Sequence, residues 1–404
     1  MITPEEAWRR IEAQLPAPGE ALRPRREAAG LVLARALSAR LDVPAADVSA
    51  MDGYALSGPV RAGERRAVAA TVRAGDPPGL VLASTEVARI MTGAPVPAGA
   101  DRVIPVEQTD GGRAEVELRA EPPAGENLRR RGEIMKAGDP LLPAGAQLTP
   151  GALALLATHG YSEVPVVRPP RIAILATGDE VVPPDAEPAP GQLRDSHTDF
   201  LLAAVSSLGL AAEPLGIAPD RDAELSALVE RGLGFDVLLL CGGVSMGEFD
   251  LVEGVLARHG CRQLFNAVAI QPGKPLVFAV HDRGIVFGLP GNPASVMVAF
   301  WLLARPALRR LLGAPDGYWA GALSAELAAP LPGAGNRDRF LPAEVAFEGG
   351  RIRATPYPPR GSHDLSAYAR GTALVRVRAG SPALPAGAPC EVLPLADWRG
   401  SARP

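Results

Sequence analysis

The sequence predicts a multidomain α/β protein in which a doubly wound parallel-sheet domain accompanies N-terminal helices, a β-rich lobe and a C-terminal β domain. Three observations support this fold class. The chain has 404 residues, which is more than one compact hydrophobic core usually contains. Apolar strands and helices alternate between Arg171 and Leu312. Short β segments broken by Gly and Pro occupy residues 41–131 and return beyond Ala314.

The composition excludes several classes of protein. Hydrophobic residues make up 47% of the chain and charged residues 21%, which is typical of a globular rather than a disordered protein. The net charge of −4 argues against a nucleic-acid partner. No window holds the roughly 20 apolar residues that a membrane span needs. The N-terminus is acidic where a signal peptide is basic, so we expect a cytoplasmic protein.

Three cysteines and five histidines are too few and too scattered for a disulfide framework or a zinc site. The cysteines are Cys241, Cys261 and Cys390.

The first elements are expected to be helices. Thr3 caps a helix that begins at Pro4, and Glu6 completes a capping box. An Ala- and Leu-rich stretch predicts a second helix around 26–40, and a third is expected over 152–159. Between them, the β-rich lobe is predicted to contain strands at 67–72, 87–91, 102–106 and 114–118.

The doubly wound domain begins with residues 171–177, a nearly continuous apolar run that indicates a strand buried on both faces. Strands are then expected at 211–217 and 236–241 and near Ala267, Val277 and Val286, and helices at 195–208, 223–232, 251–259 and 294–312. The C-terminal β domain is predicted from the patterns at 373–377 and 389–392.

Three glycine-containing loops follow strands of this domain, at 177–180, 242–250 and 288–293. Ligands of doubly wound sheets bind beyond the carboxyl ends of the strands, and glycine lets the backbone approach a phosphate closely. Each loop alone is explained equally well as a tight turn. Three loops at one edge of one sheet predict a phosphate- or nucleotide-binding site.

The same edge carries acidic side chains. Carboxylates beside a phosphate site normally need a cation between them, and Mg²⁺ prefers carboxylate, phosphate and water oxygens. Any one of these acids alone is better explained as solvated surface. The acids are Asp179, Glu180, Asp220, Glu248 and Asp250.

Only two of the 41 basic residues are lysines, Lys136 and Lys274. A lysine that persists among arginines suggests a need for a compact ammonium. Lys274 lies in a rigid turn, 270–275, which contains two prolines and a glycine, and we predict a functional role for it over the alternative of a surface turn. Lys136 is expected in an exposed turn. In the β lobe, two Gly- and Pro-shaped loops present Asp52 and Thr92.

Seven motifs in this order resemble the molybdopterin molybdenumtransferases of molybdenum-cofactor synthesis, the bacterial relatives of the gephyrin E domain. The resemblance covers nearly the whole chain. The motifs are SAMDGYA (49–55), RIMTGAPVP (89–97), NLRRRGE (127–133), ATGDE (176–180), CGGVSMGEFD (241–250), QPGKP (271–275) and GLPGNPAS (288–295).

The resemblance implies four domains and a homodimer, with each active site between the doubly wound domain of one subunit and the β lobe of the other. The doubly wound domain would be of the molybdopterin-binding type and the C-terminal domain barrel-like. The implied boundaries are 1–42 with 134–170 for the helical linking domain, 43–133 for the inserted β lobe, 171–316 for the doubly wound domain and 317–404 for the C-terminal β domain.

The implied reaction takes adenylylated molybdopterin and molybdate to molybdenum cofactor and AMP, with Mg²⁺. Contact with the molybdopterin adenylyltransferase is a further partner that the resemblance implies. The residues matched to catalysis are Asp52, Thr92, Glu180, Asp220, Asp250 and Lys274, of which Asp52, Asp250 and Glu180 are the implied metal ligands. The residues matched to substrate binding are Gly242, Gly243, Ser245, Gly247, Pro290, Gly291, Asn292, Pro293 and Ser362.

Three positions depart from the family pattern. Ile134 stands where relatives often have an acid, and Ala267 and Gln271 stand where they often have a base. These changes leave open a paralogue with reduced activity, or compensation by Lys274 and nearby arginines. Two other functions also stay open. One is a non-catalytic pterin-binding scaffold, and the other is the adenylyltransferase, which lacks the β lobe and the C-terminal domain.

Overall fold

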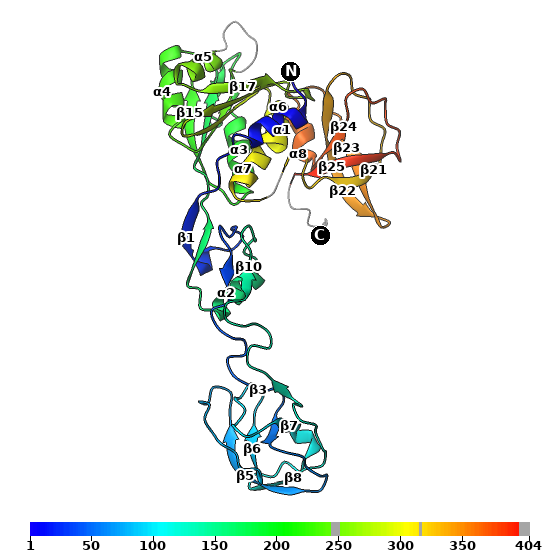
Figure 1. Cartoon of the computed structure of the whole chain (residues 1–404). Coiled ribbons are helices and arrows are strands. Elements are labelled where there is room, and N and C mark those ends of the chain that lie inside the picture. The colour runs from blue at the N-terminus through cyan, green and yellow to red at the C-terminus, as the bar shows by residue number, and fades with distance from the viewer. Residues whose placement is uncertain (244–250, 315–316, 396–404) are drawn as a thin grey trace. The chain divides into compact units, whose positions relative to one another are not determined.

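A computed structural model describes residues 1–243, 251–314 and 317–395 of the chain (Figure 1). The chain divides into two compact units. The first unit contains residues 1–21, 30–34 and 165–404, and the second contains residues 22–29 and 35–164. Within the described residues, no helix is long and apolar enough to cross a membrane.

The first unit is built on a six-stranded sheet in the order β15-β12-β16-β20-β19-β17. Neighbouring strands from β15 to β20 run parallel, as predicted, whereas β19 pairs antiparallel with both β20 and β17. The connection from β19 to β20 has two residues, which suffices for an antiparallel hairpin but not for a parallel crossover. The strands are β12 (Ile172–Thr177), β15 (Ala212–Ala218), β16 (Val237–Cys241), β17 (Arg262–Ala267), β19 (Pro275–His281) and β20 (Gly284–Leu289).

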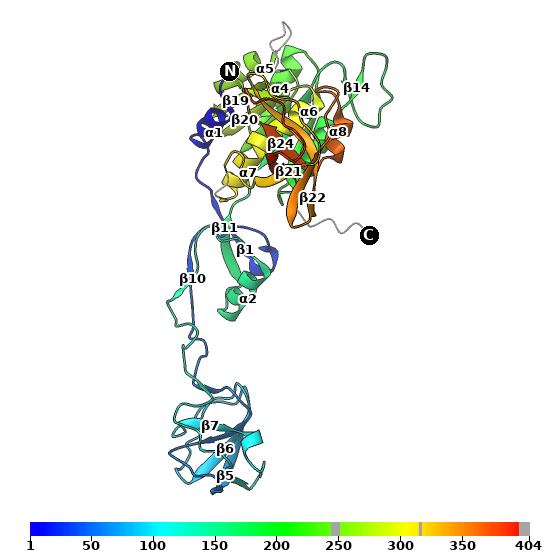
Figure 2. The same ribbon diagram turned by 90° about the vertical axis from the view of Figure 1, so that its right-hand side faces the viewer.

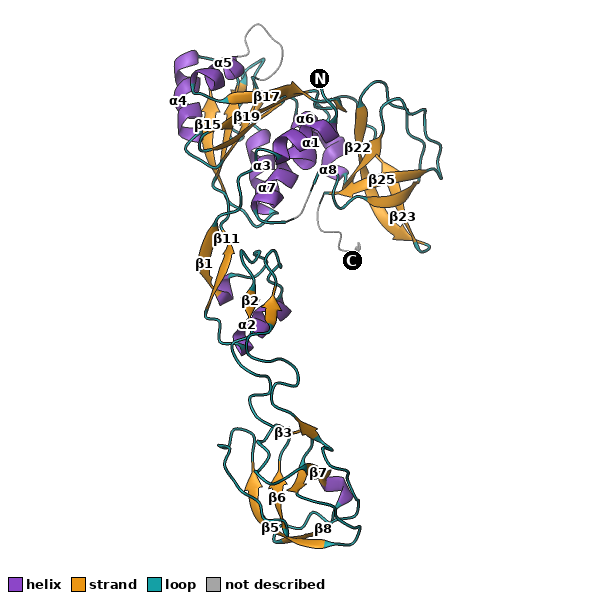
Figure 3. Ribbon diagram, viewed as in Figure 1, coloured by secondary structure: helices purple, strands orange, loops and turns teal. Residues whose placement is uncertain are grey.

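Helices cover both faces of this sheet, which confirms the doubly wound fold (Figure 3). Along β12, Ile172 and Ile174 contribute to one core while Ala173 and Leu175 contribute to the other, because successive side chains of a strand point to opposite faces. Helices α1, α3, α6 and α7 bury side chains in the first core, and α4 and α5 in the second. The helices are α1 (Pro4–Glu12), α3 (His197–Ser206), α4 (Asp222–Gly232), α5 (Leu251–Arg258), α6 (Pro293–Ala299) and α7 (Arg305–Leu311).

Two details of these helices bear on the sequence predictions. The Glu6 amide donates a hydrogen bond to Thr3 Oγ1 at 3.1 Å, so Thr3 caps α1 as predicted. The single helix expected over 294–312 is instead α6 and α7 joined by a π-helical segment, η3 (Phe300–Ala304).

A second six-stranded sheet of the first unit has the order β18-β22-β23-β21-β25-β24, and β24 also pairs with β22 (Figure 2). The β22–β24 pairing closes five strands into a barrel-like ring. The sixth strand, β18, comes from the doubly wound part of the chain but pairs with β22. The elements are β18 (Ile270–Gln271), β21 (Leu323–Leu327), β22 (Asp338–Glu348), β23 (Arg351–Pro356), β24 (Ala373–Val377), β25 (Pro389–Pro394) and helix α8 (Leu365–Arg370).

The second unit contains a five-stranded sheet in the order β7-β4-β6-β5-β8, which confirms the β-rich lobe. Its strands are β4 (Gly53–Leu56), β5 (Arg65–Val72), β6 (Glu86–Ile90), β7 (Arg102–Pro105) and β8 (Glu115–Glu117). Its other elements are η1 (Arg25–Glu27), β2 (Leu37–Ser38), β3 (Val48–Ser49), η2 (Val106–Gln108), β9 (Leu128–Arg129), β10 (Pro140–Leu142) and α2 (Pro150–Thr158). The remaining strands of the chain are β1 (Glu20–Pro24), β11 (Glu163–Val167), β13 (Val181–Val182) and β14 (Leu193–Arg194).

The helix predicted over 26–40 is wrong. The residues form the short η1, a turn in which Gly30 has a positive φ of 79°, and the strand β2, which pairs with β10. Leu33 also bridges to Val166. Helix propensity is a weak preference, and here the pairing with distant strands and the burial of Leu33 and Leu37 outweigh it.

Candidate functional site

The described residues of the three predicted glycine loops lie together at one edge of the doubly wound sheet. Strands β12, β16 and β20 are adjacent and parallel, so they end at the same edge. The Gly242 amide donates a hydrogen bond to the carbonyl oxygen of Leu289, the last residue of β20, at 3.2 Å. The Cα of Gly242 lies 4.0 Å from the Cβ that a side chain at Gly291 would add. The sequence prediction that these loops share an edge is confirmed.

Gly242 must be glycine for two reasons. Its φ of +94° is rarely adopted by other residues, and an added Cβ would lie 2.6 Å from the carbonyl oxygen of Thr177. The backbone after β16 therefore lies against the end of β12. Gly243 also has a positive φ, of +60°. Ser245, Gly247 and Asp250, which complete the predicted loop, lie outside the described residues, as does Glu248.

The carboxylates Asp179 and Asp220 interact through each other's backbone. The Asp220 amide donates to Asp179 Oδ1 at 3.1 Å, and the Asp179 amide donates to Asp220 Oδ2 at 3.4 Å. Glu180 is exposed beside them. No group of three or more metal-ligating side chains occurs among the described residues, but Mg²⁺ in phosphate sites often has only one or two carboxylate ligands. The oxygen donors at this edge are of the type that Mg²⁺ prefers.

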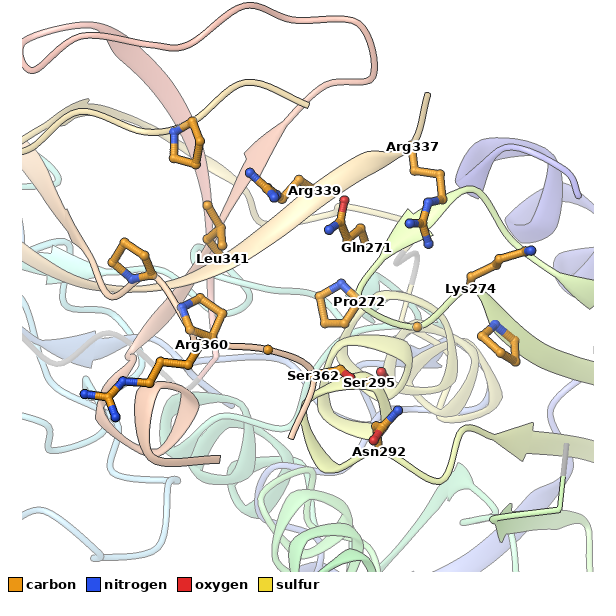
Figure 4. Close-up of a pocket in the computed structure, with 16 residues that line it drawn as sticks. Gln271, Pro272, Lys274, Asn292, Ser295, Arg337, Arg339, Leu341, Arg360 and Ser362 are labelled. Atoms are coloured by element: carbon orange, nitrogen blue, oxygen red, sulfur yellow. The ribbon is translucent and has the colours of Figure 1, made fainter. Parts of the chain in front are cut away.

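Next to this edge is a cavity of about 510 Å³, between the turn at 271–275, the start of α6 and the barrel-like sheet (Figure 4). Three residues predicted from sequence line it together: Lys274, Asn292 and Ser362. Asn292 belongs to the same 290–293 loop as Gly291, so one loop borders both the cavity and the edge of the sheet where the glycine loops lie, here called the glycine edge. The full lining is Gln271, Pro272, Gly273, Lys274, Pro275, Asn292, Ser295, Pro332, Arg337, Arg339, Leu341, Pro358, Pro359, Arg360, Gly361 and Ser362.

The cavity has a strongly cationic lining. Three arginines, Arg337, Arg339 and Arg360, line it together with Lys274, and no Asp or Glu occurs among the described lining residues. Guanidinium and ammonium groups that line a cavity without a lining carboxylate attract anions, and arginine presents a fork of donors that matches oxyanions. The cavity is therefore suited to a small, multiply charged oxyanion.

The three arginines were not found from the sequence. Arg360 lies two residues before the predicted site residue Ser362, and this proximity could have indicated it. The chain has 39 arginines, however, so the residue type alone does not distinguish those at the site. Of the two missing basic positions, Gln271 lines the cavity and Ala267 does not. The guanidinium groups of Arg337 and Arg339 thus supply charge near the neutral Gln271 side chain (Figure 4).

The opposing walls of the cavity are joined by backbone hydrogen bonds. In the β18–β22 pairing, Ile270 lies opposite Asp338 and Gln271 opposite Arg339. The Ala294 amide at the start of α6 donates to the Ser362 carbonyl oxygen at 3.1 Å. These bonds hold residues that lie far apart in the chain around one space.

A capping carboxylate orders the Arg360 end of the cavity. Asp364 Oδ2 accepts a hydrogen bond from the Arg360 amide at 3.0 Å, and Oδ1 accepts one from the Ser366 hydroxyl at 2.6 Å. The Ser366 and Arg360 hydrogen bonds lower the pKa of Asp364 to about 2. Asp364 therefore stays ionised and holds the loop at neutral pH.

In the second unit, the two residues predicted for the β lobe are in contact. Asp52 Oδ1 accepts hydrogen bonds from the Thr92 amide at 2.6 Å and from the Thr92 hydroxyl at 2.8 Å. These bonds lower the pKa of the exposed Asp52, so its carboxylate is charged at neutral pH. Its other oxygen, Oδ2, is a candidate ligand group. Ile134, where relatives often have an acid, is 68% exposed.

Three sequence models match the chain. The MoeA N-terminal region (domain I and II) matches residues 2–160, a probable molybdopterin binding domain matches residues 173–310, and the MoeA C-terminal region (domain IV) matches residues 324–395.

Named relatives resemble the chain over most of its length. A molybdopterin molybdenumtransferase 2 of Mycobacterium tuberculosis is 35% identical over 88% of this chain and 90% of its own length. A molybdopterin molybdenumtransferase of Haemophilus influenzae is 34% identical over 93% of this chain and 94% of its own length. Among solved structures, a molybdopterin biosynthesis MoeA protein from Pyrococcus horikosii is 30% identical, with a TM-score of 0.85 over 98% of this chain and all of the other.

Proposed function

Because the chain belongs to the molybdopterin molybdenumtransferase family of molybdenum-cofactor biosynthesis, we propose that it transfers molybdenum from molybdate into adenylylated molybdopterin and releases AMP. The observation that carries this proposal is the cationic cavity beside the glycine edge. The cationic cavity suits a small oxyanion, and the glycine edge suits a phosphorylated ligand. The 290–293 loop borders both.

Molybdate is a compact dianion at neutral pH, and the cavity matches it in charge. Arg337, Arg339 and Lys274 supply donors, and the Ser362 and Asn292 side chains offer further polar groups. A volume of about 510 Å³ exceeds what one tetrahedral oxyanion fills, which leaves space for the reacting end of a second ligand. Bound molybdate would therefore lie beside the substrate rather than alone.

The phosphate groups of adenylylated molybdopterin would bind at the glycine edge. Gly242 and Gly243 bring the backbone close to this edge, and Pro290 and Pro293 shape the loop that leads to the cavity. The dithiolene sulfurs belong to the substrate, so the protein needs no cysteine ligands.

Mg²⁺ is the proposed cofactor, with Glu180, Asp250 and Asp52 as candidate ligands. When bound, it would neutralise the pyrophosphate and make its cleavage easier. Carboxylates of the glycine edge, such as Glu180, would hold it there, while the cationic cavity orients molybdate. A contact with the molybdopterin adenylyltransferase, which supplies the substrate, is the partner expected for this reaction.

The direct test mixes the purified full chain with adenylylated molybdopterin, Mg²⁺ and molybdate. We expect AMP release that depends on molybdate, measured by chromatography, together with formation of molybdenum cofactor. Tight substrate binding without AMP release would indicate the non-catalytic pterin-binding alternative that the departures at Ile134, Ala267 and Gln271 leave open. Formation of adenylylated molybdopterin from ATP would instead indicate an adenylyltransferase.

We further propose a homodimer in which Asp52 of one subunit serves the site of the other. Asp52→Ala is expected to lower the rate of AMP release about tenfold, because it removes a carboxylate that positions Mg²⁺ or substrate. Thr92 supports that carboxylate through its two hydrogen bonds.

Complementation distinguishes a shared site from an internal one. Asp52→Ala and Lys274→Ala chains would be mixed, unfolded and refolded together. In a shared site, some mixed dimers regain one intact site, so at a molybdate concentration that does not saturate Lys274→Ala the activity rises above that of either variant alone. Equal activity of the mixture and the separate variants, with dimers present by light scattering, would refute the shared site.

A further inference from the structure

Arg376 and Asp338 form a buried ion pair next to Arg337 and Arg339, which line the cavity. Arg376 Nε donates to Asp338 Oδ2 at 2.8 Å, and their side chains are only 6% and 10% exposed. Arg376 also bonds Glu5 Oε1 of α1 at 2.6 Å. The rings of Tyr318 and Trp319 lie 5.4 and 5.9 Å from its guanidinium carbon. Arg376 is thus held from several sides.

Asp338 connects this pair to both walls of the cavity. It lies between Arg337 and Arg339 in the chain, and since neighbouring side chains of a strand alternate, its carboxylate points away from the cavity that they line. Its amide donates to the Ala269 carbonyl oxygen at 3.0 Å, next to the turn that carries Lys274. Its Oδ1 accepts from the Ala379 amide at 2.8 Å.

Stability alone is a weak reason for such a pair, because buried ion pairs are often no more stabilising than apolar side chains of similar size. A planar guanidinium that bonds two carboxylates does fix the position of both, which lysine cannot reproduce. Anion sites work best when their donors are held in place before the ligand arrives.

We propose that Asp338 and Arg376 are positioning residues for the oxyanion cavity, where their ion pair holds Arg337 and Arg339 in the binding geometry. This inference rests on the proposed binding of molybdate in that cavity. Neither residue lines the cavity, so both act through the arginines.

The test is calorimetric titration of molybdate into the full chain. Asp338→Asn should weaken molybdate binding about fivefold, within the range of measured coupling between residues that share a network. The direction of the change in affinity is diagnostic. Removing a negative charge near an anion site removes electrostatic repulsion, which by itself would tighten molybdate binding. Arg376→Lys, which keeps the charge but not the two-carboxylate geometry, should also weaken it.

A double-mutant cycle with Arg339→Ala isolates the positioning effect. Arg339→Ala should by itself weaken molybdate binding. Adding Asp338→Asn to Arg339→Ala should lower the molybdate affinity by clearly less than fivefold, because one of the positioned arginines is already gone. Glu391→Gln is the control. It removes a negative charge from the same sheet, in an exposed ion pair with Arg378, and should leave molybdate affinity unchanged or slightly higher. Circular dichroism identifies variants that do not fold.

The outcomes separate the two proposals. If the wild-type chain binds no molybdate, or Arg339→Ala binds it normally, the assignment of the cavity fails. If wild type binds, Arg339→Ala weakens binding, and folded Asp338→Asn and Arg376→Lys both keep wild-type affinity, the positioning role is overturned. Equal effects of Asp338→Asn with and without Arg339 would overturn it as well.

Discussion

Replacing Lys274 by alanine is expected to weaken molybdate binding about 30-fold, because a hydrogen bond to a charged group contributes about 2 kcal/mol. Lys274 lies in a rigid turn, where Gly273 is buried with a φ of +102° and the Lys274 carbonyl oxygen accepts from the Val268 amide at 3.0 Å. The backbone of the turn is therefore fixed, and the variant should lose one ammonium group without a change in fold.

The measurement is the molybdate dependence of AMP release, supported by direct titration. The KM for molybdate should rise, while saturating molybdate should restore most of the rate. Lys274→Arg should keep part of the affinity, because it keeps the charge but not the compact ammonium. Higher ionic strength should reduce the difference between wild type and Lys274→Ala.

The chain offers a matched control in its only other lysine. Lys136 lies in the second unit, in an exposed turn where its amide donates to Asp139 Oδ2 at 2.8 Å. Lys136→Ala removes the same charge from the net total, and we expect wild-type molybdate affinity. Equal behaviour of the two alanine variants would contradict a specific role for Lys274.

Gly53→Ala is expected to destabilise the second unit by about 3 kcal/mol or more, a large effect for one methyl group. An added Cβ would lie 2.0 Å from the Ile104 carbonyl oxygen and 3.0 Å from Pro105 Cα. Both atoms are backbone of β7, which pairs with β4 at Gly53↔Pro105. No rotamer change relieves this contact, so the two strands must separate.

Chemical unfolding followed by circular dichroism should show an early transition in Gly53→Ala. Because Asp52 directly precedes Gly53, AMP release should fall as well. Gly151→Ala is the control in the same unit. Gly151 lies in α2, where the nearest atom to an added Cβ is 3.9 Å away, and alanine should stabilise the helix slightly. Wild-type stability of Gly53→Ala would show that the β4–β7 spacing can adjust.

Local patterns in the sequence were sufficient for the doubly wound fold and for part of the site. The buried strand β12 and the loops after it were predictable because apolar periodicity and glycine act on the chain within a few residues. Lys274 stood out by its rarity, and it does line the cavity with Asn292 and Ser362. Asp52 and Thr92 were predicted by motif, and they form a hydrogen-bonded pair.

Other features depended on partners far away in the chain. The stretch at 26–40 has a helical composition, but pairing of β2 with β10, about 100 residues later, gives it another structure. The pairing of β18 with β22 of the barrel-like sheet is likewise a long-range pairing.

The sequence by itself determined the fold class, the glycine edge and one cation of the cavity. Only the tertiary structure decided that Arg337, Arg339 and Arg360 join that cation and that Asp338 and Arg376 lie behind them. The reason is physical. The sequence gives the charge of each of the 39 arginines but not which residues surround it. At this cavity those neighbours are set by strand pairing across roughly 70 residues, as between β18 and β22.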